Sequence, residues 1–121
     1  MSKPSPKELK SYLYGRLCFK TENYIAAPLS QEKYDTIICW STIKYIQLNF
    51  GDVGVKTVFL KSYDQLSAGG LFLLESQPWK SYKKKKRMSD RIKEVFPTIQ
   101  MKPHMFKEYL EMIGFEHVIT L

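Results

Sequence analysis

The sequence contains few of the residues that form disulfide frameworks or metal sites. Among its 121 residues are two cysteines, Cys18 and Cys39, and two histidines, His104 and His117. Both cysteines lie in apolar, strand-like segments and form no CxxC pair, so we expect them to be reduced core residues. Because these four residues are spread along the chain, they make no Cys/His cluster. We therefore expect no metal site and interpret both histidines as structural.

Long apolar runs and glycine-rich phosphate loops are also absent. No stretch approaches 18 consecutive apolar residues, and the start, MSKPSPKELK, lacks the apolar centre of a secretory signal. We therefore expect a soluble intracellular protein with no membrane partner. The six glycines cannot form a GxGxxG motif, and no Ser/His/Asp or Cys/His arrangement is evident. The residues alone thus do not define an enzyme class.

Negative charge is missing from one segment in particular. Residues 80–87 contain six of the 19 lysines and arginines and no acid, which leaves 13 basic residues against 12 acidic ones in the rest of the chain. The formal net charge of +7 is therefore concentrated in one patch. A local patch of this kind favours contact with a polyanion over a generally adhesive surface.

The chain does contain enough apolar residues, 44%, for the core of one α/β domain. Apolar runs at 34–39 and 71–74 predict two buried parallel strands, and apolar residues at helical spacing from Asp52 to Leu66 predict the helix that joins them. Asp52 would cap this helix, and 67–70 would end it. Flanking elements are predicted as helices at 5–14, 88–95 and 103–113, the last capped by Gly114, and as strands at 17–19 and 115–119.

Polar and aromatic residues follow both central strands, in the segments WSTIKY and SQPW. Because the carboxyl ends of parallel strands meet at one edge of a sheet, where ligands commonly bind, these segments should lie close together. Their aromatic rings could stack on a base, Gln77 could form amide hydrogen bonds and Lys44 could contact a phosphate. The residues leave a plainer interpretation open, in which Trp40 and Tyr45 are core aromatics and Lys44 is a solvated lysine.

The basic segment WKSYKKKKR, residues 79–87, allows three interpretations. It could be a solvated loop without a partner, a nuclear-import signal, or a contact for the phosphates of RNA or DNA. Trp79 and Tyr82 are interleaved with the lysines, which places stacking groups and charge on one loop. This interleaving favours nucleic-acid contact.

The chain resembles the bicoid-interacting-protein family of RNA methyltransferases in three stretches: YDTIICWSTIKYIQLNFGDVGVKTVF, LSAGGLFLLESQPWKSY and IQMKPHMFKEYLEMIGF. The resemblance spans about residues 17–118. It implies an α/β, Rossmann-like class I methyltransferase fold, with a mostly parallel sheet flanked by helices, in a domain of residues 17–121 that follows an N-terminal extension of residues 1–16. The implied activity is methyl transfer from S-adenosylmethionine (SAM) to the 5′-terminal (gamma) phosphate of a small RNA.

The resemblance also implies roles for particular residues. Those expected to bind SAM are Asn23, Tyr24, Cys39, Trp40 and Ser41. Those expected to bind the RNA 5′ end are Lys44, Tyr45, Gln77, Pro78 and Trp79, to which we add the basic run of Tyr82, Lys83, Lys84, Lys85, Lys86 and Arg87. Lys44 is expected to be catalytic. Methylation of an anionic phosphate oxygen requires the phosphate to be aligned and its charge balanced, and it does not require a strong base.

The chain departs from the family pattern at the cofactor site. The glycine-rich first strand and loop have no counterpart, so the chain would supply only the third to sixth strands of the family's sheet. Sheet edges and apolar faces should then be exposed. We interpret the chain as a truncated or alternative product, or as a piece that needs a partner, and we expect weak SAM affinity.

Two functional hypotheses follow. The leading one is an RNA methyltransferase of the nucleus, with the cytoplasm as a second location. Its rival is a non-catalytic module that binds RNA or takes part in ribonucleoprotein assembly with other proteins. A small-molecule methyltransferase is disfavoured, because a small substrate would not need the basic aromatic loop.

Overall fold

The computed structural model describes residues 33–39 and 42–118. In this part of the chain, strands β1 (Tyr34–Cys39) and β2 (Leu66–Leu74) form a parallel two-stranded sheet, and helix α2 (Ile43–Gln65) connects them. The following elements are α3 (Trp79–Lys83), α4 (Asp90–Val95), the 3-10 turns η1 (Phe96–Thr98) and η2 (Pro103–Met105), and α5 (Phe106–Ile113). The βαβ unit predicted from the two apolar runs is confirmed.

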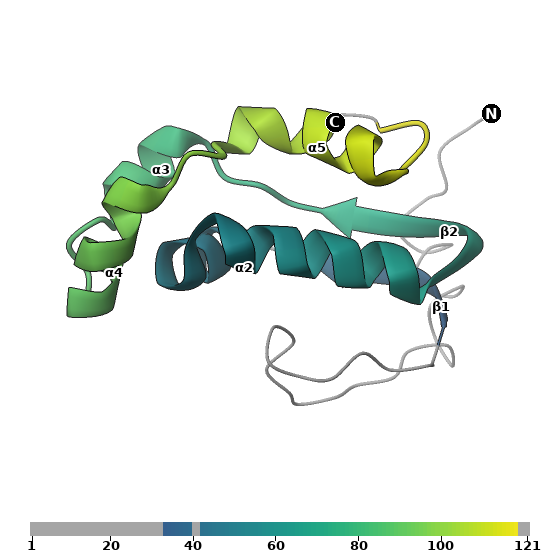
Figure 1. Cartoon of the computed structure of the whole chain (residues 1–121), viewed down its shortest axis with the longest axis horizontal. Coiled ribbons are helices and arrows are strands. Elements are labelled where there is room, and N and C mark those ends of the chain that lie inside the picture. Colours follow the sequence, from purple (N-terminus) through teal and green to yellow (C-terminus); the bar gives the residue numbers. More distant parts are fainter. Residues whose placement is uncertain (1–32, 40–41, 119–121) are drawn as a thin grey trace, which may run out of the picture.

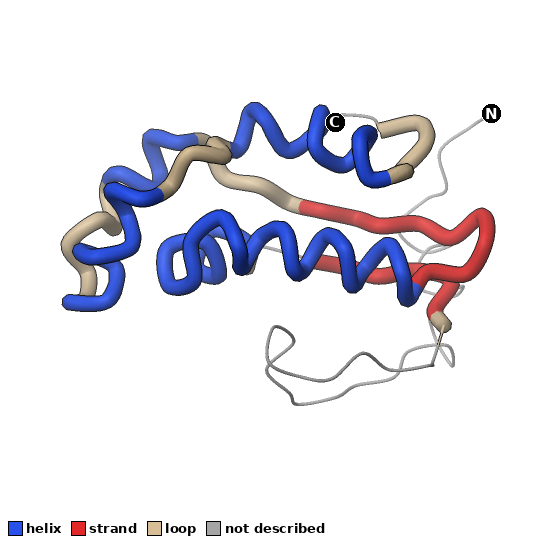
Figure 2. The backbone as a smooth tube through the Cα atoms, viewed as in Figure 1, coloured by secondary structure: helices blue, strands red, loops and turns tan. Residues whose placement is uncertain are grey.

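The helices are arranged in two groups around the sheet. Figure 1 shows α2 and α5 running along the strands, whereas α3 and α4 lie beyond the carboxyl end of β2. Figure 2 shows that the same end contains the start of α2, because that helix begins where β1 stops and then runs back along the sheet. The carboxyl edge of the sheet is therefore the place where α2, α3 and α4 meet.

The sheet pairing is regular except near its start. Thr36 to Cys39 pair one by one with Leu71 to Leu74, but the preceding pair joins Tyr34 to Leu66. The backbone of β2 between these pairs contains extra residues, and Gly69 takes a φ of 79° there. Glycine adopts this conformation without a steric penalty. The turn predicted at 67–70 is thus a bulge within β2.

Helix α2 begins earlier than predicted and is divided by a kink. It starts at Ile43 instead of Asp52, so Lys44 and Tyr45 lie in its first turn and not in a loop. Gly51 has φ 71° and ψ −161°, which is non-helical and open essentially to glycine alone. The helix start predicted at Asp52 is therefore the start of the second of two helical segments, and the first segment was not predicted.

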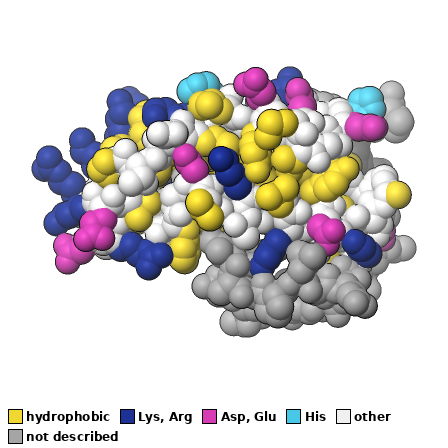
Figure 3. Space-filling view, viewed as in Figure 1, with side chains coloured by type: hydrophobic (Ala, Val, Ile, Leu, Met, Phe, Trp, Pro, Cys, Tyr) yellow, Lys and Arg dark blue, Asp and Glu magenta, His cyan; other side chains and the backbone are white. Residues whose placement is uncertain are grey.

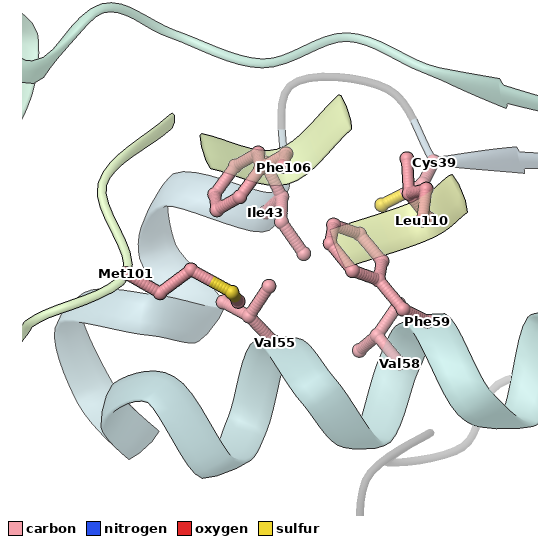
Figure 4. Close-up of a cluster of buried hydrophobic side chains, with 8 residues drawn as sticks. All are labelled: Cys39, Ile43, Val55, Val58, Phe59, Met101, Phe106 and Leu110. Atoms are coloured by element: carbon pink, nitrogen blue, oxygen red, sulfur yellow. The ribbon is translucent and has the colours of Figure 1, made fainter. Parts of the chain in front are cut away.

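The main core lies between the sheet, the second segment of α2 and α5. Phe59 is fully buried at its centre and makes edge-to-face contacts with Phe72 and Phe106, with ring centroids 6.1 and 5.4 Å apart. Figure 4 shows side chains from α2, α5 and β1 converging on the same space. The cluster consists of Cys39, Ile43, Val55, Val58, Phe59, Met101, Phe106 and Leu110.

A second, smaller core lies at the end where α2, α3 and α4 meet. It contains Leu48 from the first segment of α2, Tyr82 from α3, Ile92 from α4 and Ile99 from the segment after η1. Trp79 and Phe96 pack against it, with their rings stacked at a centroid separation of 5.0 Å. This second core holds the short helices against the carboxyl edge of the sheet.

The chain after β2 follows the sequence prediction in its two later helices, but it differs from the prediction in α3, where a loop was expected, and at its end. Helix α4 begins at Asp90, and the Ser89 side chain caps it by accepting a hydrogen bond from the Ile92 N–H at 3.1 Å. Gly114, with φ 125°, ends α5 as predicted. Residues 115–118, however, form no strand, so that prediction is wrong for them. The ring of Phe115 packs on Phe72, which accounts for the apolar pattern that suggested a strand.

The predicted helix at 5–14, the strand at 17–19 and Ile119 lie outside the described residues. The two-stranded α/β unit is compatible with part of a methyltransferase fold.

Candidate functional site

The side chain of Lys44 lies at the junction of α2 and α3. Lys44 is only 9% exposed, and its Nζ donates a hydrogen bond to Ser81 Oγ at 2.9 Å. The same ammonium lies 4.8 Å from the centroid of the Tyr45 ring, which is 38% exposed. The two segments that follow β1 and β2 are therefore brought together, as the parallel topology predicts.

The charge of Lys44 is not neutralised by a neighbouring acid among residues 33–39 and 42–118. Its polar contact there is a serine hydroxyl, and the ion pairs of this region involve other lysines. The first turn of α2 contains no acidic residue. Because a helix N-terminus carries partial positive charge, the helix and the ammonium together favour an anion at this position.

Trp79 is packed into the second core, in a helix where a loop was expected. It starts α3, and its ring contacts both Phe96 and Tyr82, the latter at a centroid distance of 5.2 Å. The ammonium of Lys102 lies 4.5 Å from the centroid of the same ring. The indole is thus surrounded by aromatic and cationic groups at the rim of the site.

Tyr82 does not offer the ring face that the sequence suggested, because it is fully buried. Its hydroxyl donates to Gln47 Oε1 at 2.7 Å. Burial raises the pKa of Tyr82 well above its usual value of 10.0, so it is a neutral donor over the physiological range. The expectation that Tyr82 stacks on RNA is corrected. Although Tyr82 directly precedes the exposed lysines, its side chain points inwards, because helix α3 directs it into the second core.

A buried polar network lies beneath this rim. Gln47, which is fully buried, donates from Nε2 to the Met101 carbonyl at 2.6 Å and to Asp52 Oδ1 at 3.1 Å. The Asp52 carboxylate also accepts hydrogen bonds from the backbone N–H groups of Gln100 and Met101. Asp52, expected to cap a helix, therefore binds a segment 48 residues further along the chain.

Gln77 and Pro78 connect β2 to α3. Gln77 Nε2 donates to Glu75 Oε1 at 3.0 Å, and Pro78 is exposed. The amide of Gln77 is half-buried beside the end of β2, on the same edge of the sheet as the start of α2. Contact of Gln77 and Pro78 with RNA remains a prediction.

The basic run is a solvent-exposed turn between α3 and α4. Its five exposed cationic side chains are those of Lys83, Lys84, Lys85, Lys86 and Arg87. Figure 3 shows lysine and arginine side chains gathered at the end of the molecule where Figure 1 places α3 and α4. Positive charge is therefore concentrated next to the helix whose Ser81 contacts Lys44.

Of the five residues expected to bind SAM, the structure describes only Cys39. The side chain of Cys39 is buried, and its sulfur lies 3.2 Å from the Thr42 hydroxyl oxygen. Burial raises the pKa of the Cys39 thiol, with a smaller opposite effect from the Thr42 hydrogen bond, so the thiol is neutral and matches the core role expected of it. The other four, Asn23, Tyr24, Trp40 and Ser41, lie outside the described residues.

Lys102 is a component of the site that the sequence did not reveal. It lies 58 positions from Lys44 along the chain, and only the fold brings its ammonium over Trp79. Its place just before Pro103, at the start of a helical turn, gives a structural signal and no functional one. Neither periodicity nor a local motif could have identified it.

The described residues also limit the kinds of site that are present. Within residues 33–39 and 42–118 no group of three or more His, Cys, Asp or Glu side chains could hold a metal ion. No helix of the described part is long and apolar enough to cross a membrane.

The sequence comparisons define the class to which this α/β unit belongs. The family profile described as Bicoid-interacting protein 3 (Bin3) matches residues 34–121, which include β1, the site and every later element. The chain is therefore a member of the Bin3 family, and the resemblance inferred from three stretches of the sequence is confirmed.

Individual relatives give the same result. The chain is 41% identical over 105 residues to the Arabidopsis thaliana protein named "Probable RNA methyltransferase", covering 85% of this chain and 33% of that protein. It is 38% identical over 101 residues to the 7SK snRNA methylphosphate capping enzyme of Mus musculus, covering 79% and 15%. It is 37% identical over 89 residues to the U6 snRNA methylphosphate capping enzyme Amus of Drosophila melanogaster, covering 74% and 30%. The chain thus spans one third or less of these relatives.

Proposed function

We propose that this chain forms the RNA-facing part of a SAM-dependent RNA methyltransferase that modifies the 5′-terminal phosphate of a small RNA. The names of the relatives support the substrate class, since two of them are methylphosphate capping enzymes for small nuclear RNAs. The same names support action in the nucleus. The transfer to the gamma phosphate and the 5′-phosphorylated substrate belong to the proposal.

The observation that carries the proposal is the state of Lys44. The residue is only 9% exposed, and its ammonium donates to a neutral hydroxyl and has no carboxylate partner within the described part of the chain. A buried cation is normally stabilised by an opposite charge. A terminal phosphate bound beside Ser81 would supply that charge, and the N-terminus of α2 would add to the attraction.

The surroundings of Lys44 match an RNA terminus better than a small anion. Tyr45 presents a partly exposed ring beside the ammonium, and Lys102 and Trp79 lie at the rim. The exposed basic run continues from the end of α3 and would follow the backbone phosphates further along the RNA. The phosphate would be met by Lys44, a base by the ring of Tyr45 and the backbone by the basic run.

The chemistry required of these residues is modest. A phosphate oxygen is already anionic, so the methyl acceptor needs no strong general base. Lys44 would hold the phosphate and balance its remaining charge, while Gln77 and Trp79 would fix the terminal nucleotide. SAM would donate the methyl group.

The described residues do not make up a SAM site. The one SAM-site residue among them, Cys39, is a buried neutral thiol that contacts Thr42, and the sequence has no glycine-rich loop. No step assigned to Lys44 or to the RNA-facing residues depends on where the cofactor lies.

The competing function is a non-catalytic RNA-binding or ribonucleoprotein-assembly module. The exposed basic run is the observation that supports it. Methyl transfer from labelled SAM to a 5′-triphosphate RNA distinguishes the two functions. RNA retention without transfer, both in this chain and in a form extended at its N-terminus, would favour the assembly module.

A binding experiment tests the role of Lys44 directly. Two RNAs of identical sequence, one with a 5′-triphosphate and one with a 5′-hydroxyl, are titrated with the chain at fixed salt. We expect the wild-type chain to prefer the triphosphate and Lys44→Ala to lose about tenfold of that preference, because a charge-assisted hydrogen bond is removed. An unchanged preference in Lys44→Ala would exclude this lysine from phosphate recognition.

The control replaces the four lysines at 83–86 by glutamine. These side chains are exposed and lie outside the Lys44–Ser81 contact. We expect this variant to bind both RNAs more weakly and to show a shallower dependence of affinity on salt, because fewer counterions are released. Its preference for the triphosphate should remain that of the wild type, which separates end recognition from general attraction.

A further inference from the structure

One buried amide connects the segments that carry the charged and aromatic groups of the site. Gln47 Oε1 accepts a hydrogen bond from the Tyr82 hydroxyl, and its Nε2 donates to the Met101 carbonyl and to Asp52. Both N–H groups and the carbonyl oxygen of the amide are thus engaged. Gln47 and Tyr82 are each 0% exposed, so water cannot replace either partner.

Each partner of this amide is adjacent in the chain to a group at the rim. Lys44 precedes Gln47 by three residues, so the two side chains lie on the same face of α2. Tyr82 follows Ser81, the hydrogen-bond acceptor of Lys44. Met101 precedes Lys102, whose ammonium lies over the Trp79 ring. The amide thus links backbone segments that lie next to Lys44, Ser81 and Lys102 in the chain.

Apolar packing alone would fix this spacing less strictly. The second core contains Leu48, Ile92 and Ile99, and aliphatic contacts of this kind have no preferred direction. A hydrogen bond between two buried groups is directional, and its loss leaves a polar atom without a partner. The hydrogen bonds therefore fix the position of α3 relative to α2. The aliphatic contacts by themselves would allow α3 to shift slightly along α2.

Asp52 completes the network from its other side. Its carboxylate accepts from the Gln100 and Met101 N–H groups, which ties the same backbone segment to the start of the second half of α2. Gln47 and Asp52 hold this segment through one carbonyl and two N–H groups. Lys102 thus extends from a backbone fixed on both sides.

We propose that Gln47 and Tyr82 are positioning residues for 5′-phosphate recognition, holding Ser81 against the Lys44 ammonium so that the ammonium meets the terminal phosphate in one fixed geometry. This inference rests on the proposed function, because it needs Lys44 to bind the RNA end. The two residues act through Lys44 and do not touch the RNA. Their removal should reduce the ability to distinguish RNA ends more than it reduces RNA binding.

The test is the ratio of affinities for 5′-triphosphate and 5′-hydroxyl RNAs of identical sequence. Tyr82→Phe keeps the ring and removes only the hydroxyl. We expect the ratio to fall about fivefold, the effect of one lost hydrogen bond. A variant that is merely less folded binds both RNAs in the same reduced proportion and leaves the ratio unchanged.

Three further variants make the result decisive. Gln47→Met keeps the length of the side chain and removes the whole amide, and we expect at least the same loss of the ratio. Tyr82→Phe combined with Lys44→Ala should lose no more than Lys44→Ala alone, since both act on one contact. Tyr63→Phe removes a hydroxyl from the half-exposed tyrosine near the other end of α2 and should keep the wild-type ratio.

The outcomes separate the inference from the function on which it rests. Wild-type ratios in both Tyr82→Phe and Gln47→Met would overturn the positioning role and leave the role of Lys44 intact. If Tyr82→Phe does not fold, Gln47→Met alone decides by the same ratio. A wild-type chain that binds the two RNAs equally would overturn the proposed function itself.

Discussion

The two segments of α2 on either side of Gly51 pack in different ways. The second segment buries Val55, Val58 and Phe59 in an apolar core against the sheet and α5. The first segment buries Lys44 and Gln47, whose polar ends contact α3 and the segment at 100–101. The second segment thus belongs to a conventional core, whereas the first adds buried polar side chains to the apolar contacts of Ile43 and Leu48.

Under the proposed function, this difference separates stability from RNA recognition. The apolar core gains from the area it removes from water, and it tolerates small changes of side-chain direction. The polar end depends on individual hydrogen bonds, each of which requires a defined distance and angle. We therefore expect substitutions in the second segment to act mainly on unfolding, and substitutions in the first to act mainly on RNA discrimination.

The largest effect on stability should come from Phe59→Ala. Phe59 is fully buried and contacts three other aromatic rings, so the truncation leaves a cavity at the centre of the core. We expect a loss of about 3–5 kcal/mol in the free energy of unfolding, measured by urea titration. Leu60→Ala, at a 50% exposed position on the same helix, is the control. Similar losses in the two variants would contradict the placement of the core.

A smaller effect is expected from Gly51→Ala, which changes the junction between the two segments. A Cβ at this position would lie 3.7 Å from its nearest neighbours, so space is available and the cost comes from the backbone conformation. We expect a loss of about 1–3 kcal/mol by urea titration. Faster hydrogen exchange should be confined to the first segment and α3. Uniformly faster exchange would show that the kink is not a boundary.

The smallest effect concerns the pH dependence of stability at Tyr82. Burial raises the pKa of this hydroxyl in the folded chain above its unfolded value of about 10. The stabilisation it contributes is therefore complete below pH 10 and declines as the pH rises further, by about 1.4 kcal/mol per pH unit until the folded value is reached. Raising the pH from 9 to 11 should lower the free energy of unfolding less in Tyr82→Phe than in the wild type, as measured by urea titration. Equal losses would mean that Tyr82 ionises freely in the folded chain.

Much of the α/β unit could be predicted from local sequence. The consecutive apolar residues of β1 and β2 predicted two parallel strands, and the spacing of Val55, Val58 and Phe59 predicted a helix with one buried face. The expectation that both strands are buried is wrong in part, because Ile38 is 44% exposed and Leu71 is 59% exposed. Gly114 was a sufficient signal for the end of α5. These features depend on residues that are close together in the sequence, which is why periodicity and capping rules identify them.

The candidate site could be predicted only in part. Parallel topology predicted that the segments after β1 and β2 meet, and the Lys44–Ser81 hydrogen bond joins them. The inward direction of Tyr82 could not be predicted, because it depends on the short helix α3 packing on α2. A last strand was predicted at 115–119, but residues 115–118 form no strand, and Phe115 and Val118 pack as single side chains against the core.

The sequence by itself determined the two parallel strands, the helix between them, the isolated basic run and membership of the Bin3 family, because each is written in neighbouring residues. Tertiary structure alone decided that Asp52 binds the backbone of Gln100 and Met101, and that Lys102 lies over Trp79. The reason is physical. These contacts join residues far apart in the chain, and their partners are set by how helices pack and not by any local pattern.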